Sequence, residues 1–584
     1  MRTPTGGLTF DLMRRPWRIR SADPALVARL AADLGVSSVT ARLLVLRGLD
    51  TPEAAQRHLR PTVEDLHDPL DLPDMERAAA RVTQALERRE RILVHGDYDV
   101  DGMIGAALLV HFGRLLGAEV EAHIPDRTRD GYSIRDAAVE RVLREKFGLV
   151  ISVDNGTGAV EAVERLQRSG VDVVVTDHHL PGPRVAPAYA LVNPRRSGSR
   201  YPYAGLCGAA VAFKLAWSVA ERLSPARKRS EPVRGFLHDA LALVAVATLA
   251  DLSPLDGENR TLVRFGLAGL ATTSHPGLLA LLEGANLGGR APTSEDVTFR
   301  ISPKLNAAGR LGRQEVALEC LMTPSHVRAK ECVRELERLN AKRQRLDREA
   351  TEEARARVRS EVDLDREPAI LLASEKWHPG VLGLGAYRLA EEFSRPVALV
   401  ALAAGRGRAS MRAPEGFHLP AILAACDDLL DEHGGHAQAA GFEVRAENLE
   451  RLRRRLGEVV GACARGPAPL AIDAELPLPS LTPDLFREIA RLEPFGAGNE
   501  APIFAAAGVE VLEPARRAPR GEWVLTLREG AAVLQARSRS PGFETVPPGA
   551  VVSIAYTPLR WRGTGEGEIR LRDVCLEPTL AFVA

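Results

Sequence analysis

One short stretch constrains the fold more than any other: an apolar run that stops at a group of acids. Residues 92–94 are Ile-Leu-Val, and an imidazole and three carboxylates follow directly: His95, Asp97, Asp99 and Asp101. Residues 104–116 then have the composition of a helix. A strand that leads through an acidic turn into a helix carries its acids at its carboxyl end, where open parallel sheets bind ligands. The stretch therefore predicts an α/β fold with a ligand site at one edge of a parallel sheet.

The three acids also have the spacing that opens a calcium-binding EF-hand loop. Such a loop needs a bidentate Glu at its twelfth position, and Leu108 stands there. A strand rather than a helix also precedes the acids. The EF-hand interpretation is therefore excluded.

Apolar runs that end in acids recur downstream. Residues 149–153 lead into Asp154, and residues 171–176 lead into Asp177, His178 and His179. Strand-like and helix-like stretches alternate from residue 92 to about residue 194, which predicts βαβ units. Right-handed crossovers keep the strand ends on one edge, so we expect these acids and imidazoles to converge.

Asp251 is a fourth candidate ligand, at the end of an apolar helix predicted over residues 237–249. The carboxyl end of a helix disfavours a negative charge unless a cation lies nearby. Carboxylates with one or two imidazoles suit Mn²⁺ or Mg²⁺, whereas a site without thiolates is a poor candidate for structural zinc. The motifs together indicate a divalent-metal site.

The chain of 584 residues is too long for one core, so several domains are expected. Residues 325–362 contain no Pro or Gly and are highly charged, which predicts one long helix. Short strand-like runs with Gly and Pro turns near the carboxyl end favour a small barrel. The expected parts are an amino-terminal helical wrap of the first domain (1–90), an α/β domain (91–324), a connecting helix (325–362), a smaller α/β domain (363–466) and a β-barrel (467–584).

Composition narrows the class of protein. There are 77 basic and 77 acidic residues, so any surface for a polyanion must be local. The six cysteines include no Cys-x-x-Cys pair, which favours free thiols in a reducing cytosol. No run approaches the roughly 20 apolar residues of a membrane span. We expect a cytoplasmic bacterial protein that does not contact a membrane.

In this order, the motifs resemble those of the DHH–DHHA1 phosphoesterase family. A block of Gly-Gly-His and Ala-Ala-Gly-Phe follows at residues 434–442. Residues 47–52, 302–310 and 492–499 further resemble a branch of bacterial exonucleases specific for single-stranded DNA. The resemblance covers nearly the whole chain. It implies a DHH domain, a DHHA1 domain and a terminal OB-fold.

The resemblance implies two divalent cations, Mn²⁺ or Mg²⁺, with Mn²⁺ favoured. One site would be formed by Asp101, Asp154, His178 and Asp251. The other would contain Asp99 and the bridging Asp154, completed by Asp97 or by His95, with Asp97 favoured. His179 matches the residue expected to face the scissile phosphate, so His179 and Asp154 are the expected catalytic residues.

In the smaller α/β domain, the resemblance implies a site for a 5′-terminal phosphate. Its expected residues are Arg408, Ser410, Arg412, Gly434, Gly435 and His436. A hydroxyl and a planar guanidinium suit phosphate, and glycines let backbone N–H groups approach an anion. Gly434 and Gly435 would also end a helix predicted over 419–432. Asn306 and Arg310 match a segment that contacts DNA.

The expected activity is 5′→3′ exonuclease cleavage of single-stranded DNA by a two-metal mechanism, in DNA recombination and repair. The expected partners of this monomer are a 5′-phosphorylated strand, a single-strand-binding protein and a helicase. Whether the terminal barrel grips DNA stays open, because acids such as Glu522 and Glu568 are interleaved with its arginines.

Two alternative functions remain. A DHH-family oligoribonuclease or cyclic-dinucleotide phosphodiesterase would usually lack the terminal barrel and the amino-terminal wrap. A non-catalytic DNA-binding scaffold would be expected to have lost metal ligands, whereas every ligand position here carries a competent side chain.

Overall fold

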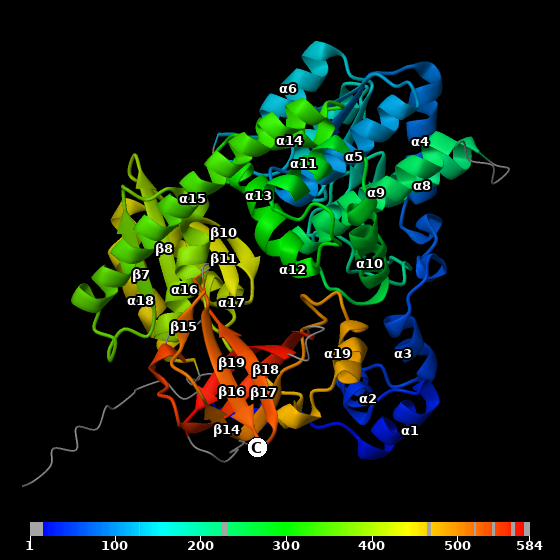
Figure 1. Ribbon diagram of the computed structural model, residues 1–584. Coiled ribbons are helices and arrows are strands. Elements are labelled where there is room, and N and C mark those ends of the chain that lie inside the picture. The colour runs from blue at the N-terminus through cyan, green and yellow to red at the C-terminus, as the bar shows by residue number, and fades with distance from the viewer. Residues whose placement is uncertain are drawn as a thin grey trace, which may run out of the picture. The chain divides into compact units, whose positions relative to one another are not determined.

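A five-stranded parallel sheet carries the acidic motifs (Figure 1). The structure is a computed structural model that describes residues 16–127, 129–224, 231–463, 469–518, 521–539, 543–561 and 567–576. The strand order is β3-β2-β4-β5-β6, and every neighbouring pair is parallel. The strands are β2 (Ile92–His95), β3 (Val120–His123), β4 (Leu149–Val153), β5 (Asp172–Thr176) and β6 (Ala190–Val192). The predicted alternation of strands and helices is confirmed.

Helices cover both faces of this sheet, so its strands are almost continuously apolar. Ile92 and Val94 belong to one core cluster, and Leu93 between them belongs to the other, as the two-residue period of a strand requires. The first cluster contains residues of α4 (Met75–Arg88), α5 (Val100–Leu115), α8 (Gly208–Leu223) and α9 (Glu231–Ala250). The second contains residues of α6 (Asp136–Glu145) and α7 (Val160–Arg168).

Helix α9 reaches the length and hydropathy of a membrane span, which the sequence analysis did not anticipate. The stretch Pro232–Ala250 has 19 residues and a mean hydropathy of 1.5, and α10 (Gly257–Thr272) with α11 (Pro276–Gly284) passes the same test as a pair bent by 84°. In the structure 56% of the α9 stretch is buried, and α9 packs against α5, α8 and α10. A helix that is apolar on most sides is typical of a protein core as well as of a membrane.

The predicted connecting helix is α15 (His326–Glu361), which runs from the first α/β part to the second (Figure 1). Its first half contributes residues from Ala329 to Leu339 to the core of the first α/β part. Its second half contributes Ala350, Ala354 and Val358 to a core of the second part. The helices before it are α12 (Ser294–Asp296), a π-helical turn η3 (Val297–Ile301), α13 (Ser302–Arg310) and α14 (Gln314–Met322).

The second α/β part is a five-stranded mixed sheet with the order β10-β11-β9-β8-β7, in which only β7 and β8 are parallel. Its strands are β7 (Ile370–Ser374), β8 (Val397–Ala403), β9 (Arg406–Arg412), β10 (Leu430–His436) and β11 (Ala439–Arg445). Its helices are α16 (Leu382–Phe393), α17 (Leu419–Ala424) and α18 (Leu449–Gly461).

The helix predicted over residues 419–432 was wrong in its second half. Helix α17 ends at Ala424, and β10 already begins at Leu430. Gly434 and Gly435 therefore lie in a strand and do not end a helix. Pairing with β11 overrides the local helical pattern, and a Cβ at Gly435 would lie 2.5 Å from the Cα of Ala440.

The carboxy-terminal part is a closed barrel, as predicted. Strand β14 pairs with both β18 and β16 and so closes the ring β14-β18-β19-β17-β16. These strands are β14 (Phe504–Val511), β16 (Trp523–Glu529), β17 (Ala532–Ser538), β18 (Val551–Trp561) and β19 (Gly567–Cys575), with short β13 (Ala474–Glu475) and β15 (Arg516–Arg517) beside them.

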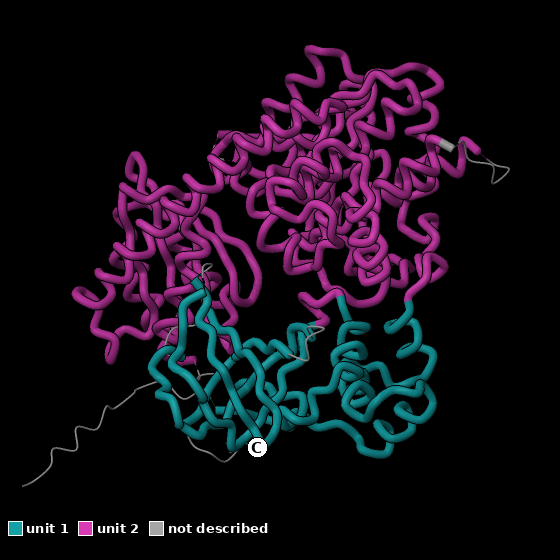
Figure 2. The backbone as a smooth tube through the Cα atoms, in the orientation of Figure 1, with its two compact units in different colours: residues 1–60, 465–493, 500–584 teal, residues 61–464, 494–499 magenta. Residues whose placement is uncertain are grey.

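By its contacts the chain forms two units, one of residues 1–60, 465–493 and 500–584, and one of residues 61–464 and 494–499 (Figure 2). The first unit holds β1 (Trp17–Ile19), α1 (Pro24–Leu34), α2 (Ser38–Val45), α3 (Pro52–Leu59), β12 (Leu470–Ile472) and α19 (Pro483–Ala490) together with the barrel.

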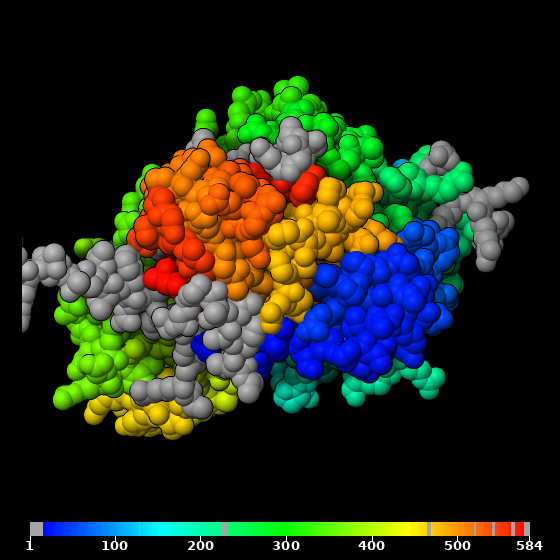
Figure 3. Space-filling view, turned by 60° about the horizontal axis from the view of Figure 1, so that its bottom comes forward, coloured from blue at the N-terminus to red at the C-terminus, as the bar shows by residue number. Residues whose placement is uncertain are grey.

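The amino-terminal segment up to residue 60 belongs to the unit that contains the barrel, and the expected wrap over residues 1–90 stays a prediction. Strand β1 pairs in parallel with β12, and the hydroxyls of Ser37 and Thr40 donate to the carboxylate of Glu488 at 2.5 and 2.6 Å. Figure 3 shows the blue amino-terminal helices against the gold segment that contains α19. Residues 61–90, with α4, belong to the unit that contains the parallel sheet; residues 1–15 lie outside the described part. The remaining domain boundaries stay predictions.

Candidate metal centre and anion clefts

The carboxyl ends of β2, β4 and β5 bring the predicted ligands together with the end of α9. Within each of three groups, the ligand atoms lie within 4.8 Å of one another: Asp154, His178 and His179; Asp101, His178 and Asp251; Asp97, Asp99 and Asp154. Asp154 and His178 each belong to two groups. Two residues, Asp97 and His95, were candidates to complete the site of Asp99. Among the described residues, Asp97 is grouped with Asp99, and His95 is in none of the groups.

The turn after β2 is held tightly by α5. The carboxylate of Asp99 caps this helix by accepting the N–H groups of Asp101 and Gly102 at 3.0 and 3.1 Å. A Cβ at Gly102 would lie 2.2 Å from the backbone nitrogen of Asp97. Glycine at this position lets the first turn of α5 pack against the acidic turn, which places three carboxylates within a few residues of chain.

Asp101 is buried and points at the amino end of α8. Its two oxygens accept the N–H groups of Gly208 and Ala209 at 2.6 and 2.8 Å. Unpaired N–H groups at a helix amino end stabilise a carboxylate. Burial and the neighbouring Asp99 nevertheless raise the pKa of Asp101 to about 6. Gly208 has no room for a side chain, because a Cβ there would lie 2.5 Å from the Cβ of Asp154.

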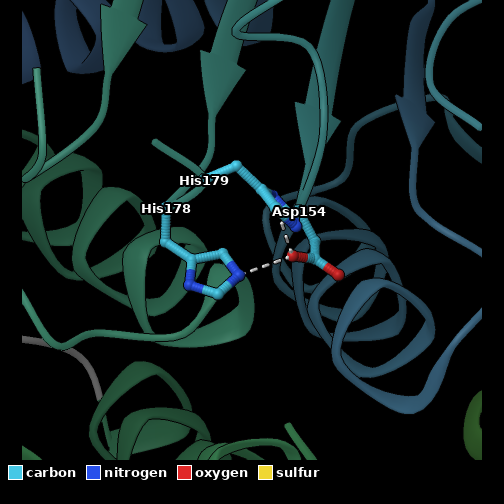
Figure 4. Close-up of side chains that lie close together, drawn as sticks. All are labelled: Asp154, His178 and His179. Atoms are coloured by element: carbon cyan, nitrogen blue, oxygen red, sulfur yellow. Dashed lines mark ion pairs between the residues drawn. The ribbon is translucent and has the colours of Figure 1, made fainter. Parts of the chain in front are cut away.

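Asp154 has two unusual features. Its backbone φ is +63°, in the left-handed region that costs energy for a residue with a side chain. Its Oδ1 lies 3.0 Å from Nε2 of His178 (Figure 4), yet this buried oxygen accepts no hydrogen bond. A carboxylate oxygen and an imidazole nitrogen that approach each other in this way, with the oxygen otherwise unpaired, fit a shared position for a cation.

The electrostatics of the cluster also fit a cation. Burial, together with the charges of Asp101, Asp99, Asp97 and Asp251, holds the pKa of Asp154 well above its usual range. Burial and Asp101 raise the pKa of Asp251 to about 8. Burial lowers the pKa of His178 to about 3, so this imidazole is neutral and can act as a ligand. Buried carboxylates without counter-charges are stable as anions only when they coordinate a metal.

His179 is positioned by a residue that is not itself in the ligand groups. Its Nδ1 lies 2.8 Å from Oδ1 of Asp177 and 3.2 Å from the hydroxyl of Tyr132, and its side chain is 46% exposed. Asp177 is further held by the N–H groups of Thr157 and His178 at 3.0 and 2.7 Å. Burial would raise the pKa of Asp177, but the hydrogen bonds from His179 and Thr157 outweigh it and hold that pKa below its usual range.

Most of the residues predicted to bind a terminal phosphate line one cleft of about 370 Å³. They are Arg408, Ser410, Arg412, Gly434 and Gly435, whereas His436 is not among the lining residues. Arg127, from the loop after β3, completes this cleft. Its carbonyl accepts a hydrogen bond from Arg408 at 3.4 Å, and its guanidinium lies 5.1 Å from the centre of the Tyr98 ring. The sequence analysis missed Arg127 because a single loop arginine in an arginine-rich chain carries no local signal.

Asn306 and Arg310 line a second cleft of about 750 Å³, and Arg412 lines both. Further arginines of the second cleft are Arg343, Arg348 and Arg388. Burial, and then the charges of Arg127, Arg343 and Arg412, lower the pKa of Arg310 to about 10. The two clefts therefore meet at a concentration of positive charge, which suits a polyanion.

Comparison with known proteins places these features in one family. Three family models match: the DHH family N-terminal domain over residues 91–248, the DHHA1 domain over 367–462 and the RecJ OB domain over 472–573. The single-stranded-DNA-specific exonuclease RecJ of Bacillus subtilis is 32% identical over 579 residues, which cover 97% of this chain and 71% of that protein. The chain belongs to the RecJ family.

Other RecJ proteins agree with this assignment. RecJ of Thermus thermophilus is 37% identical over 519 residues, which cover 88% of this chain and 73% of that protein. The crystal structure of Thermus thermophilus RecJ in complex with Mn²⁺ matches with a TM-score of 0.81 at 33% identity, covering 98% of this chain and 81% of that chain. Its complex with Mg²⁺ matches with a TM-score of 0.75 at 31% identity, covering 97% and 79%.

Proposed function

We propose that this RecJ-family protein is an exonuclease specific for single-stranded DNA that removes nucleotides in the 5′→3′ direction with two divalent cations, in DNA recombination and repair. Its relatives carry the name of a single-stranded-DNA-specific exonuclease, and a related RecJ structure is a Mn²⁺ complex. The observation that carries the proposal is the shared position of Asp154, which belongs to two groups of ligand atoms at once.

The donor set fits the two cations. Asp101, His178 and Asp251 would hold one cation, and Asp97, Asp99 and Asp154 the other; Asp154 also lies in a third group with His178. Oxygen donors with a neutral imidazole suit Mn²⁺ or Mg²⁺. When bound, such a pair of cations activates water and stabilises the attacking and leaving oxygens of a phosphodiester.

His179 would contact the substrate and would not have a purely structural role. Because Asp177 and Tyr132 engage its Nδ1, the other ring nitrogen is left to donate to an oxygen of the scissile phosphate. Asp177 also raises the pKa of His179 against the effect of burial, to about 9. A protonated imidazole is a good donor to a phosphate oxygen.

The smaller cleft would set the 5′→3′ direction of cleavage. Arg127, Arg412 and the Ser410 hydroxyl line this cleft and offer charged and neutral donors to a terminal phosphate. Arg310 lines the larger cleft with Arg412 and donates at 3.3 Å to the carbonyl of Gly380, which lines the smaller one. A strand held by its 5′ phosphate would therefore place its first linkages near the metal ligands.

The barrel would contribute less to the grip than its arginines suggest. Glu568 accepts from Arg537 at 3.0 Å and from Arg560 at 2.5 Å, and Glu522 accepts from Arg539 at 3.0 Å. These guanidinium groups are already neutralised by carboxylates. We assign the main phosphate contacts to the two clefts, and a single-strand-binding protein and a helicase remain predicted partners.

Digestion of labelled strands tests the proposed function. A 5′-phosphorylated single strand labelled at either end should yield a mononucleotide from its 5′ end first, in Mn²⁺ or Mg²⁺ and not in EDTA. A blunt duplex of the same sequence should resist. Release from the 3′ end first, or faster turnover of short oligoribonucleotides or cyclic dinucleotides, would contradict the proposal.

A further inference from the structure

The larger cleft contains one acid that a DNA-binding surface would be expected to exclude. Among the described residues that line it, Asp347 of α15 is the single carboxylate, and the same cleft is lined by Arg310, Arg343, Arg388 and Arg412. A negative charge repels a phosphodiester backbone. The side chain is only 5% exposed, so its presence is not explained by a solvated helix face.

The hydrogen bonding of Asp347 is incomplete. Its Oδ2 accepts from Nη1 of Arg388 at 2.9 Å, whereas its buried Oδ1 has no hydrogen-bond partner. A buried acceptor without a donor costs free energy, so such an atom in a native structure needs an explanation.

Arg343 is a further cation of this cleft. It lies one turn before Asp347 on α15, and one of its nitrogens donates to Oδ1 of Asn340 at 2.6 Å. Burial and the charge of Arg388 lower the pKa of Arg343, and the charge of Asp347 opposes them. Two guanidinium groups at one wall of a cleft would repel each other without a carboxylate between them.

We propose that Asp347 is a positioning residue that aims Arg388 at a phosphate of the single strand in the larger cleft. This inference rests on the proposed function, since it assigns that cleft to the DNA strand. Asp347 itself touches no substrate. It fixes the direction of the flexible Arg388 side chain, so that less side-chain freedom is lost when the strand binds.

The test asks whether the affinity for single-stranded DNA rises or falls when Asp347 loses its charge. Asp347→Asn keeps the size of the side chain and removes its charge. Plain electrostatics predicts tighter binding of a polyanion, because one repulsive charge is gone. The positioning role predicts weaker binding, by about tenfold, and a shallower salt dependence, by about 0.7 in the slope of log K against log salt for each phosphate that an arginine no longer neutralises.

Affinity for a 5′-phosphorylated oligothymidylate would be measured by fluorescence anisotropy in EDTA across salt concentrations, and KM and kcat in Mn²⁺. The matched control is Glu349→Gln, which removes an exposed carboxylate from the same helix outside the cleft. Arg388→Ala should weaken binding like Asp347→Asn, and adding Asp347→Asn to it should change affinity less than twofold. The Arg388 side chain is partly exposed, so the Arg388→Ala protein should fold and can be measured even if the buried Asp347→Asn substitution impairs folding.

Binding by Asp347→Asn that is as tight as wild type or tighter, with an unchanged or steeper salt slope, would overturn the inference. The inference would also be overturned if the increases in KM caused by Asp347→Asn and Arg388→Ala multiplied in the double variant. Failure of the proposed function is a separate result, seen as a wild-type protein that does not degrade single-stranded DNA at all.

Discussion

Oδ1 of Asp154 lies 3.0 Å from Nε2 of His178, and this pair connects all three groups of candidate metal ligands. The approach joins the ends of two neighbouring strands, β4 and β5. Neither atom can satisfy the other without a proton or a cation between them. The left-handed backbone of Asp154 maintains this arrangement at an energetic cost, as strained residues at functional sites do.

Asp154→Asn should abolish cleavage while the protein stays folded and binds DNA. Asn tolerates the left-handed backbone, so the turn is preserved, and only the shared anionic ligand is removed. We expect single-turnover cleavage to fall by about 100-fold or more, since removing a metal ligand costs more than removing a residue that only supports one. Binding to a single strand in EDTA should stay near wild type. Substantial activity in Mn²⁺ would contradict the two-cation site.

Removing the metal should make stability depend on pH in a defined direction. The folded-state pKa values of Asp101, about 6, and Asp251, about 8, lie above the unfolded value of about 3.9. Between about pH 6.5 and 8 the imidazoles of the unfolded chain are neutral, and the folded protein still binds a proton at Asp251 that the unfolded chain has released, so stability must fall as pH rises through this range. In EDTA the melting temperature should decrease over this range.

Mn²⁺ should reverse that decrease, with a larger rise in melting temperature at pH 8 than at pH 6. Calorimetry at matched ionic strength measures both effects, and the Asp154→Asn protein is the control with a weakened site. A metal-free protein that becomes more stable between pH 6 and pH 8 would show that the pKa values of these carboxylates are not raised in the folded state.

Arg412→Ala should reduce the preference for a phosphorylated 5′ end. Hydrogen bonds between charged groups contribute about 1.5–3 kcal/mol, so the ratio of kcat/KM for phosphate and hydroxyl ends should fall by roughly tenfold or more. Arg406→Ala is the matched control, since Arg406 lies on the same strand but does not line the cleft. Equal ratios in wild type and the Arg412 variant would remove the assigned role.

Asp177→Asn should act through His179. The substitution takes away the carboxylate that holds Nδ1, and supporting groups of this kind contribute about 10- to 100-fold to activity. We expect kcat to fall within that range, and the double variant with His179→Ala to be no slower than His179→Ala alone. Kinetics of the two single variants and the double variant measure the coupling. Independent, multiplicative losses would show that Asp177 does not work through His179.

The barrel and the helical linker were predictable because their patterns are local. Repeated short apolar runs with Gly and Pro turns indicate β-structure, and 36 residues without Pro or Gly indicate α15. The boundary at β10 was not predictable in the same way. Residues 427–433 could continue a helix, and only the pairing of β10 with β11 makes Gly434 and Gly435 part of a strand.

Within the site, the order of residues was enough to group Asp97, Asp99, Asp154 and His178, because each follows an apolar strand and parallel strands end on the same edge. Arg127, Tyr132 and Asp347 could not be found that way. Each lies in a loop or on a polar helix whose local composition is ordinary, and each becomes informative only through a neighbour that is distant in the chain.

The periodicity of apolar residues along the chain was sufficient for the α/β class, the strand ends and the identity of most candidate ligands, since periodicity depends only on near neighbours. Folding in three dimensions decided which atoms face each other: that Asp154 approaches His178 without a hydrogen bond, that Arg412 lines two clefts, and that residues 16–60 pair with the barrel unit. Such contacts depend on the path of the whole backbone, and no local pattern of side chains encodes that path.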